Sequence, residues 1–305
     1  MAVVVTGSSG FIGAHLCAAL RARGESPVGI DRIDSDSVPT IQTDLAEPSD
    51  EAIDALRAAD VVWHLAALPG IRDRRPDIES LRYRDNVLAA GNVLKAVPPA
   101  TPLVVTSSSS VYGGSRHGGI DRPCRESDPL RPRGGYARSK VSMELLCMER
   151  AERGGRVAIG RPFTVAGEGQ RSDMAIATWI ESIRAGKVVT ILGSPERTRD
   201  VSDVRDVVRA LIVMAERDVS GAVNLGSGKA NTLADIVFAV SEALALPAVL
   251  EVVPARTEEV TATRADTALC VERLGVEFGT DLRALVRRQV EEGITAIPST
   301  LQEVG

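Results

Sequence analysis

A tyrosine and a lysine stand four residues apart, at Tyr136 and Lys140, in a segment whose periodicity predicts a helix over 136–153. Residues at this spacing share one helix face, so the phenol and the ammonium are expected to be neighbours. An unperturbed tyrosine has a pKa of about 10 and is a poor base at neutral pH. A nearby positive charge favours the phenolate, which allows proton exchange with a substrate hydroxyl. Taken alone, a tyrosine and a lysine at this spacing could equally be two neighbouring surface residues without a catalytic role. The choice between these two interpretations depends on the other motifs in the sequence.

A run of four serines, 107–110, ends the predicted strand 103–107. Ser108 is therefore expected at the carboxyl end of a parallel strand, where such sheets bind ligands. Its hydroxyl can orient a substrate oxygen or relay its proton. A serine run without further context is more typical of a loop.

Glycines at positions 7, 10 and 13 follow a predicted strand and open a predicted helix over 11–23. Gly7 permits a tight turn, Gly10 lets the backbone approach a pyrophosphate, and Gly13 lets the helix pack on the strand. The helix N-terminus offers free N–H groups and partial positive charge to phosphates. In this context the motif predicts a dinucleotide site.

The residues after the second and third predicted strands indicate which dinucleotide is bound. Asp31 can accept hydrogen bonds from the adenosine ribose and repels a 2′-phosphate, which favours NAD over NADP. Arg32 could bind that phosphate instead, but we interpret it as a solvated side chain. Asp44 and Leu45 could bracket the adenine, and the alternative for Asp44 is a helix cap.

Strands that alternate with helices predict βαβ units and a parallel sheet. We expect an α/β fold, a Rossmann-type doubly wound parallel sheet with a smaller C-terminal α/β substrate-binding lobe. The NAD-binding domain is expected over 1–162, with its sheet completed by about 197–226, and the lobe over 163–196 and 227–305. The expected strands are 3–5, 27–30, 40–43, 60–64, 103–107, 157–160, 188–192, 223–225 and 250–253; the further expected helices are 49–58, 76–97, 175–185, 204–216 and 233–243, and 113–135 is expected to be a long loop.

Nine motifs in order resemble the extended short-chain dehydrogenase/reductases, specifically the NAD-dependent epimerase/dehydratase family. They are Thr6–Gly13, His64–Ala67, Ser107–Gly113, Tyr136–Lys140, Arg161–Val165, Gln170–Met174, Arg199–Asp200, Asn224–Gly228 and Arg264–Asp266. The chain is most similar to the UDP-glucuronate and UDP-glucose 4-epimerases of that family. The resemblance implies NAD as cofactor, a UDP-linked sugar as substrate, and a homodimer formed by a four-helix bundle from helices 76–97 and 136–153.

The resemblance also implies residue roles. It makes Ser108, Tyr136 and Lys140 catalytic, and Lys140 can also hold the nicotinamide ribose, whose positive ring adds to the effect of the ammonium. The candidate cofactor-binding residues are Gly7, Gly10, Phe11, Ile12, Gly13, Asp31, Arg32, Asp44, Leu45, Leu65, Ala66, Ala67, Tyr136 and Lys140. The candidate substrate-binding residues are Ser108, Ser109, Thr164, Arg171, Met174, Arg199 and Arg256, of which the last two match arginines that grip the substrate diphosphate.

Two serines indicate the type of reaction. Dehydratases of the family carry an Asp-Glu pair directly after the catalytic residue, and its decarboxylases usually carry a Glu there. Here Ser109 and Ser110 stand in those places and cannot act as acids or bases near neutrality. Epimerisation at C4 needs neither acid, and is therefore the expected activity. The alternatives are another nucleotide-sugar dehydratase or reductase, or a non-catalytic NAD-binding sensor, although such sensors typically lose the tyrosine or the lysine.

The sugar is less clearly indicated. Arg171 matches the arginine that meets the C6 carboxylate in UDP-glucuronate 4-epimerases, and a planar guanidinium suits a carboxylate. Alternatively, Arg171 serves a phosphate or the lobe interface. The chain departs from the family pattern at Val201, Ala166 and Gly134–Gly135, and the changes at Gly134 and Ala166 are expected to line the sugar pocket.

Composition excludes several other classes. The net charge of −5 argues against a general nucleic-acid binder. No apolar run approaches about 18 residues, so no membrane span is expected, and the N-terminus resembles a strand rather than a signal peptide. The cysteines are scattered, which is typical of reduced thiols and favours the cytoplasm. The histidines show no metal-ligand spacing, so no metal is expected. The cysteines are Cys17, Cys124, Cys147 and Cys270, and the histidines are His15, His64 and His117.

Overall fold

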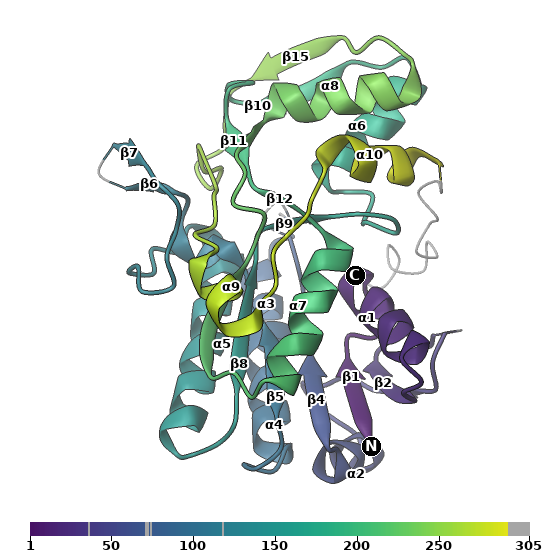
Figure 1. Cartoon of the computed structure of the whole chain (residues 1–305), viewed down its shortest axis with the longest axis vertical. Helices are drawn as coiled ribbons and strands as arrows, with labels where there is room; N and C mark the ends of the chain where they lie inside the picture. The colour runs from purple at the N-terminus through teal and green to yellow at the C-terminus, as the bar shows by residue number, and fades with distance from the viewer. Residues whose placement is uncertain (36, 71–72, 74, 118, 292–305) are drawn as a thin grey trace.

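The computed structural model describes residues 1–35, 37–70, 73, 75–117 and 119–291, and it contains a seven-stranded parallel sheet (Figure 1). Its order is β13-β8-β5-β4-β1-β2-β3, and every neighbouring pair is parallel. The α/β fold with a Rossmann-type sheet is thereby confirmed. The strands are β1 (Val3–Thr6), β2 (Pro27–Asp31), β3 (Thr40–Gln42), β4 (Val61–His64), β5 (Leu103–Thr106), β8 (Ala158–Pro162) and β13 (Gly221–Leu225).

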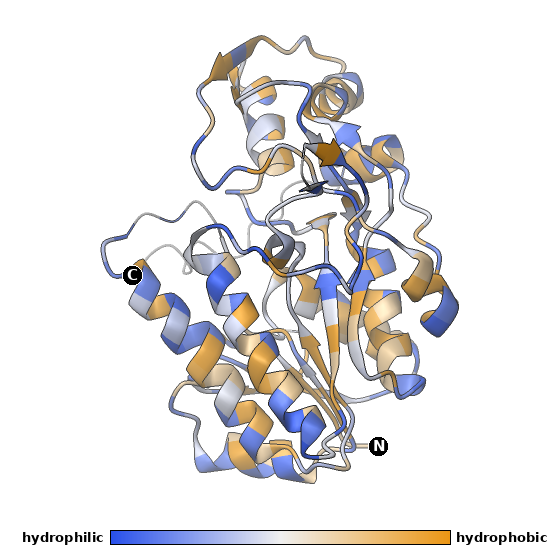
Figure 2. Ribbon diagram, turned by 90° about the vertical axis from the view of Figure 1, so that its left-hand side faces the viewer, coloured by the Kyte–Doolittle hydropathy of each residue, from blue (hydrophilic) through white to orange (hydrophobic). Residues whose placement is uncertain are grey.

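The central strands β1, β4 and β5 are buried at every position and apolar at all but the last, as is typical of a sheet covered by helices on both faces. Val3 and Val5 face one core with helices α1 (Phe11–Ala22) and α7 (Val204–Glu216), whereas Val4 faces the other core. The second core includes residues of α2 (Asp50–Ala58), α4 (Ala89–Ala96) and α5 (Gly134–Glu152). Figure 2 shows the strands as largely apolar ribbons between helices that carry polar residues on their outer faces.

The segment expected as one helix over 76–97 is interrupted. It contains α3 (Ile78–Tyr83), a π-helical segment η1 (Arg84–Leu88) and then α4. A π turn carries an additional residue and is frequently found at functional sites. Both Asp85 and Asn86 in this segment are buried.

A third core lies in the C-terminal part of the chain, at the top of Figure 1. It is built by α6 (Ala175–Arg184), α8 (Leu233–Leu244), α10 (Leu282–Glu291) and the strand β10 (Val189–Leu192), which pairs with the mostly exposed strand β15 (Leu250–Val253). The residues 292–305 of the expected lobe lie outside the described residues.

Several short elements connect this third core to the sheet or extend from it. They are β9 (Thr164–Ala166) paired with β12 (Val201–Asp203), β11 (Thr198–Arg199) paired with β14 (Asn231–Thr232), helix α9 (Ala268–Leu274), the 3-10 turn η2 (Ser109–Tyr112) and the hairpin of β6 (Arg116–His117) and β7 (Ile120–Asp121). The expected loop 113–135 therefore contains a small hairpin and the start of α5. Among the described residues, none of the helices combines the length and apolar character needed to cross a membrane.

Candidate active site

The glycine loop has the geometry of a phosphate cradle. Gly7 has a φ of 71°, and a Cβ there would lie 2.5 Å from the main-chain nitrogen of Ala66. A Cβ on Gly13 would lie 2.0 Å from the carbonyl oxygen of Gly7. Helix α1 begins here without a side-chain cap and without an acidic residue in its first turn, so its N-terminal N–H groups suit a pyrophosphate.

Asp31 lies beside this loop at the end of β2. Its carboxylate accepts hydrogen bonds from the main-chain N–H groups of Ser9 (3.0 Å) and Ile33 (3.3 Å). Burial raises the pKa of Asp31 above its ordinary value, and the backbone hydrogen bonds oppose that shift. The carboxylate is held next to the phosphate cradle, where an adenosine ribose would be recognised.

Arg32 is exposed, as expected of a solvated side chain, but its guanidinium also binds Asp85 and Asp44. The sequence did not reveal these ion pairs, because Asp85 lies in the π-helical segment. The helix-cap alternative for Asp44 is wrong, since Ser49 caps α2 by accepting from Ala52 N–H.

The other expected cofactor residues lie on the segments that follow β1, β3 and β4. Phe11 and Ile12 begin α1 and are half-buried against the first core, and Leu45 is buried in the second core. The half-buried residues Leu65, Ala66 and Ala67 follow β4. Leu65 N–H donates to the Thr6 carbonyl oxygen at 3.1 Å, which places this segment against the glycine loop.

Tyr136 and Ser108 meet at the carboxyl end of the sheet. Tyr136 lies in the first turn of α5 and Ser108 follows β5, and the Ser108 hydroxyl is close enough to the phenol to influence its pKa. Burial raises the pKa of the Tyr136 phenol, while Ser108, Arg171 and Arg82 oppose that rise. The sequence argument expected a lowered pKa because it counted the lysine and the nicotinamide but not the burial.

The Lys140 ammonium points to the end of β5 and donates to the carbonyl oxygen of Thr106 at 2.9 Å. Burial lowers its pKa to about 8. Lys140 and Tyr136 occupy successive turns of one helix, as expected, and Ser139 between them bonds to the Tyr136 carbonyl oxygen and to Asn86. The amide of Asn86 also holds the main chain of Leu68.

His64, at the end of β4, packs in the protein interior as expected. Its Nδ1 lies 2.7 Å from the Thr6 hydroxyl, and burial together with the charge of Lys140 lowers its pKa to about 3. The histidine is therefore neutral at physiological pH. Across the described ranges, histidines, cysteines and acids form no group of three that could hold a metal ion.

An ion pair that the sequence did not predict lies beneath the serine run. Glu144 on α5 binds Arg161 on β8 through two hydrogen bonds of 2.9 and 2.6 Å, and both side chains are buried. The Ser107 hydroxyl donates to the same carboxylate, and Arg161 also donates to the Tyr112 hydroxyl. This network fixes the turn that presents Ser108.

Two arginines converge on Gly70, near Tyr136. Arg82 of α3 is buried and donates to the Gly70 carbonyl oxygen at 2.7 Å. The Arg171 guanidinium would lie 3.6 Å from a Cβ on Gly70, and it binds Asp173 at 2.9 and 2.8 Å. Sequence reasoning singled out Arg171 and missed Arg82.

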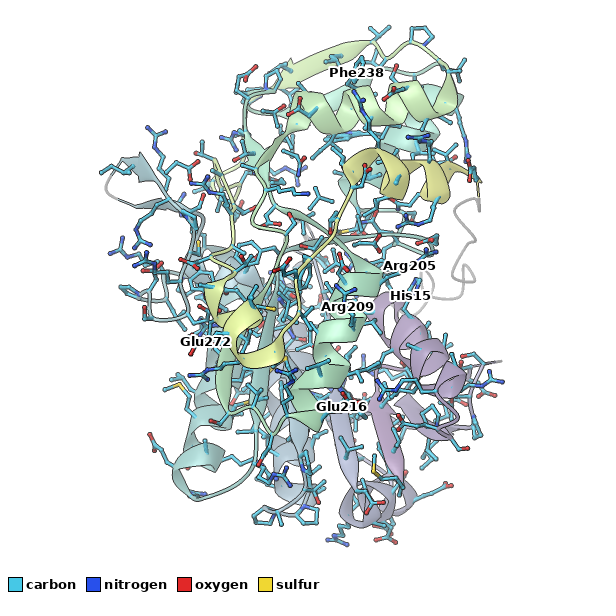
Figure 3. All side chains as sticks on the ribbon, in the orientation of Figure 1. His15, Arg205, Arg209, Glu216, Phe238 and Glu272 are labelled. Atoms are coloured by element: carbon cyan, nitrogen blue, oxygen red, sulfur yellow. The ribbon has the colours of Figure 1, made fainter. Side chains whose placement is uncertain are left out.

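Glu168 anchors the segment that carries Arg171. Its carbonyl oxygen accepts from His15 of α1 at 2.8 Å, and its carboxylate accepts from Arg205 of α7 and Arg288 of α10. Figure 3 shows the side chains of His15 and Arg205 near one another, where α7 begins above α1. The segment 166–171 is thus held by three helices.

The remaining substrate candidates come from the short strands. Thr164 in β9 lies opposite Val201 in β12, and Met174 is the N-cap of α6. Arg199 donates to Glu259 at 3.3 Å, and Glu259 N–H donates to the carbonyl oxygen of Arg256, whose side chain is exposed.

Asp200 explains how these segments come together. This buried aspartate accepts from the main-chain N–H groups of Ser227, Gly228 and Ala265, at 2.8, 3.0 and 2.9 Å. It therefore joins three segments that are far apart in sequence, and it places Arg199 at their junction.

The profile of the NAD dependent epimerase/dehydratase family matches residues 3–226. The chain is 27% identical over 304 residues to the uncharacterized UDP-glucose epimerase YtcB of Bacillus subtilis (strain 168), covering 93% of this chain and 95% of that protein. It is 26% identical over 307 residues to UDP-glucuronic acid decarboxylase 1 of Arabidopsis thaliana, covering 95% and 69%.

Solved structures are similar over nearly the whole chain. MoeE5 in complex with UDP-glucose and NAD is 36% identical with a TM-score of 0.86, covering 96% of this chain and 98% of that one. The UDP-glucuronic acid 4-epimerase of Bacillus cereus, in complex with UDP-glucuronic acid and NAD, is 26% identical with a TM-score of 0.87 and the same coverage.

Proposed function

This chain belongs to the NAD dependent epimerase/dehydratase family, and on that premise we propose that it inverts C4 of a UDP-hexose. The family and the solved neighbours establish NAD as the cofactor. When bound, NAD supplies a reversible hydride acceptor that is regenerated in each cycle. Every other requirement of the reaction falls on residues of this chain.

One observation carries the proposal: Tyr136 and Ser108 lie together at the carboxyl end of the sheet, and the two residues after Ser108 are Ser109 and Ser110. Tyr136 would take the proton from the sugar O4 and later return it, while Ser108 orients that oxygen. An elimination of water would need an acid and a base beside the sugar. Hydroxyls at 109 and 110 do not provide them near neutrality.

Lys140 would support this chemistry by holding the cofactor in place. Its ammonium at the end of β5 is positioned to hold the nicotinamide ribose, and a lysine with a pKa of about 8 is largely charged at neutral pH. The cofactor-binding role proposed for the glycine loop, Asp31 and the segment 65–67 rests on the close-packed turn and the uncapped start of α1.

Arg199 and Arg256 would bind the diphosphate. Their segments are linked through Glu259, and guanidinium groups suit phosphate oxygens. We propose that residues 163–196 and 227–305 form the lobe that binds the nucleotide sugar, with Thr164 and Met174 at its edge, and that 1–162 with about 197–226 form the NAD-binding domain.

UDP-glucuronate is the substrate that we favour. The Arg171 guanidinium lies close enough to Tyr136 to affect the pKa of the phenol, so it can meet a C6 carboxylate there. Its bidentate pairing with Asp173 means that the substrate carboxylate would have to share or replace that partner. UDP-glucose and UDP-galactose are the rival pair, and MoeE5 has been solved with both UDP-glucose and UDP-glucuronic acid.

We further propose a homodimer in the cytoplasm. Tyr83 and Leu88 on the α3–η1 segment and Leu145 and Met148 on α5 are exposed, and these two helical segments pack side by side. A hollow of about 590 Å³ is lined by Tyr83 and Leu88. Leu145→Lys should give a monomer in sedimentation.

The four cysteines are free and buried, as suits a reducing compartment, and cell fractionation tests that location.

The function is tested by incubating the purified protein with UDP-glucuronate, UDP-galacturonate, UDP-glucose or UDP-galactose, without added NAD. An epimerase yields the C4 epimer in both directions. A UDP-pentose or a dehydrated sugar would instead support the decarboxylase or dehydratase alternative, and the absence of any product would favour a sensor.

A further inference from the structure

Four charged side chains form a closed ring, here called the charged ring, between the ends of β2 and β3 and the π-helical segment. Arg32 donates to Asp85 at 2.9 and 2.5 Å and to Asp44 at 3.0 Å. Arg84 donates to Asp85 at 2.9 Å and closes the ring by binding Asp44. Two guanidinium groups thus face two carboxylates, and the ring has no net charge.

The π-helical segment is what allows this ring to form. Asp85 is buried, with 8% of its side chain exposed, whereas Arg32 remains 47% exposed. The next residue, Asn86, is also buried and braces Leu68 and Ser139. Two consecutive residues of the π turn therefore contact two parts of the site. Asp85 binds Arg32, which follows Asp31, and Asn86 binds Ser139 on the helix that carries Tyr136 and Lys140.

The position of Arg32 in the chain connects the charged ring to the expected cofactor site. Arg32 directly follows Asp31, where a cofactor ribose would be recognised. An arginine in this region is the group that accommodates the 2′-phosphate of NADP, and such a phosphate carries a charge of about −1.5 to −2. In the ring, two hydrogen bonds to Asp85 and one to Asp44 occupy three of the five N–H groups of Arg32 and offset its charge.

We propose that the charged ring is a cofactor-selectivity device: Asp85 and Asp44 hold Arg32 so that it cannot bind a 2′-phosphate, and the protein therefore excludes NADP. Asp31 alone repels the phosphate, and the ring removes the cation that would compensate for it. The inference rests on the proposed adenosine site beside Asp31, and it is independent of the sugar that is converted.

The test variant is Asp85→Asn, which keeps the side-chain shape and leaves the ring with an unbalanced positive charge. Purified protein is equilibrated with equal excesses of NAD and NADP, separated from unbound dinucleotide and denatured, and the released NAD and NADP are quantified. A released Arg32 that makes one new charged hydrogen bond should raise the bound NADP:NAD ratio by about 10–150-fold.

Two controls isolate Arg32. The double variant Arg32→Gln with Asp85→Asn should lose the gain, and Asp54→Asn, which breaks the exposed Arg57–Asp54 pair on α2, should leave the ratio unchanged. If melting curves show that Asp85→Asn is unfolded, Asp44→Asn unbalances the same ring from a more exposed position and should raise the ratio in the same direction.

The outcomes are distinct. An unchanged ratio in the folded ring variants, or an equal gain in the double variant, would overturn the proposal. A wild-type protein that binds neither dinucleotide would refute the adenosine site itself, and a wild type that binds NADP as well as NAD would show that the ring does not select.

Discussion

The Glu144 carboxylate binds the Arg161 guanidinium through two hydrogen bonds inside the protein, beneath the serine turn that begins at Ser108. Neither side chain exposes more than 7% of its surface. Each group therefore depends on the other, because an unpaired charge at this depth is costly.

Glu144→Ala should consequently destabilise the protein by about 3–5 kcal/mol, since it leaves Arg161 charged and unpaired. Glu149→Ala is the matched control on the same helix. It removes an exposed partner of Arg153 and should cost about 1 kcal/mol or less. Urea unfolding of both variants measures the difference in the free energy of unfolding. Equal losses of stability would show that the buried ion pair contributes no more than the exposed one.

Tyr136→Phe should lower kcat by roughly 10²–10⁴-fold, the usual contribution of a general acid/base. The variant loses only the hydroxyl, so its melting temperature should remain close to that of the wild type. Tyr83→Phe, at an exposed tyrosine on α3, provides the control and should keep full activity. Full turnover by the Tyr136 variant would exclude the proton-transfer role.

His64 should make the fold sensitive to acid. Its pKa is about 3 in the folded protein, against an ordinary 6.5, because burial and Lys140 disfavour its charged form. Between these two pH values the unfolded chain binds a proton that the folded chain does not, so the free energy of unfolding falls as the pH falls. His64→Asn should flatten that slope in chemical unfolding at several pH values, whereas an identical slope would mean that His64 is protonated in the folded state.

Arg171→Ala should reduce turnover of UDP-glucuronate by a further factor of about 10–150 relative to UDP-glucose, the worth of one charged hydrogen-bonding group. Asp173→Asn tests the same contact in the opposite direction. It frees the guanidinium from its bidentate partner and should lower KM for UDP-glucuronate more than for UDP-glucose. Equal losses on both sugars in Arg171→Ala would assign the residue to the diphosphate or to structure.

The sequence predicted the parts of the fold that depend on local pattern. The apolar strands and the helix beginning at Phe11 follow from β-branched runs and from the glycine spacing, and Tyr136 and Lys140 follow from helical periodicity. Apart from β3, which was expected over 40–43, strands of two or three residues such as β9 and β12 were not predicted, because they are too short for a periodic signal.

Parts of the site escaped prediction because they depend on contacts between distant segments. Asp200 binds main-chain groups 27 to 65 residues away, and Arg82 meets Gly70 only once α3 has folded against the loop after β4. The π turn that buries Asp85 leaves no local signature that we recognised. The raised pKa of Tyr136 likewise comes from burial, which sequence spacing does not report.

The measurement that tests the central claim most directly is the conversion of UDP-glucuronate in D₂O without added NAD, followed by mass spectrometry and NMR of the product. Oxidation and reduction at C4 within one closed site predict UDP-galacturonate of unchanged mass, with no deuterium on carbon, and the same final mixture when UDP-galacturonate is the starting sugar. Loss of carbon dioxide, loss of water, or deuterium on the sugar carbons would contradict the proposed epimerisation.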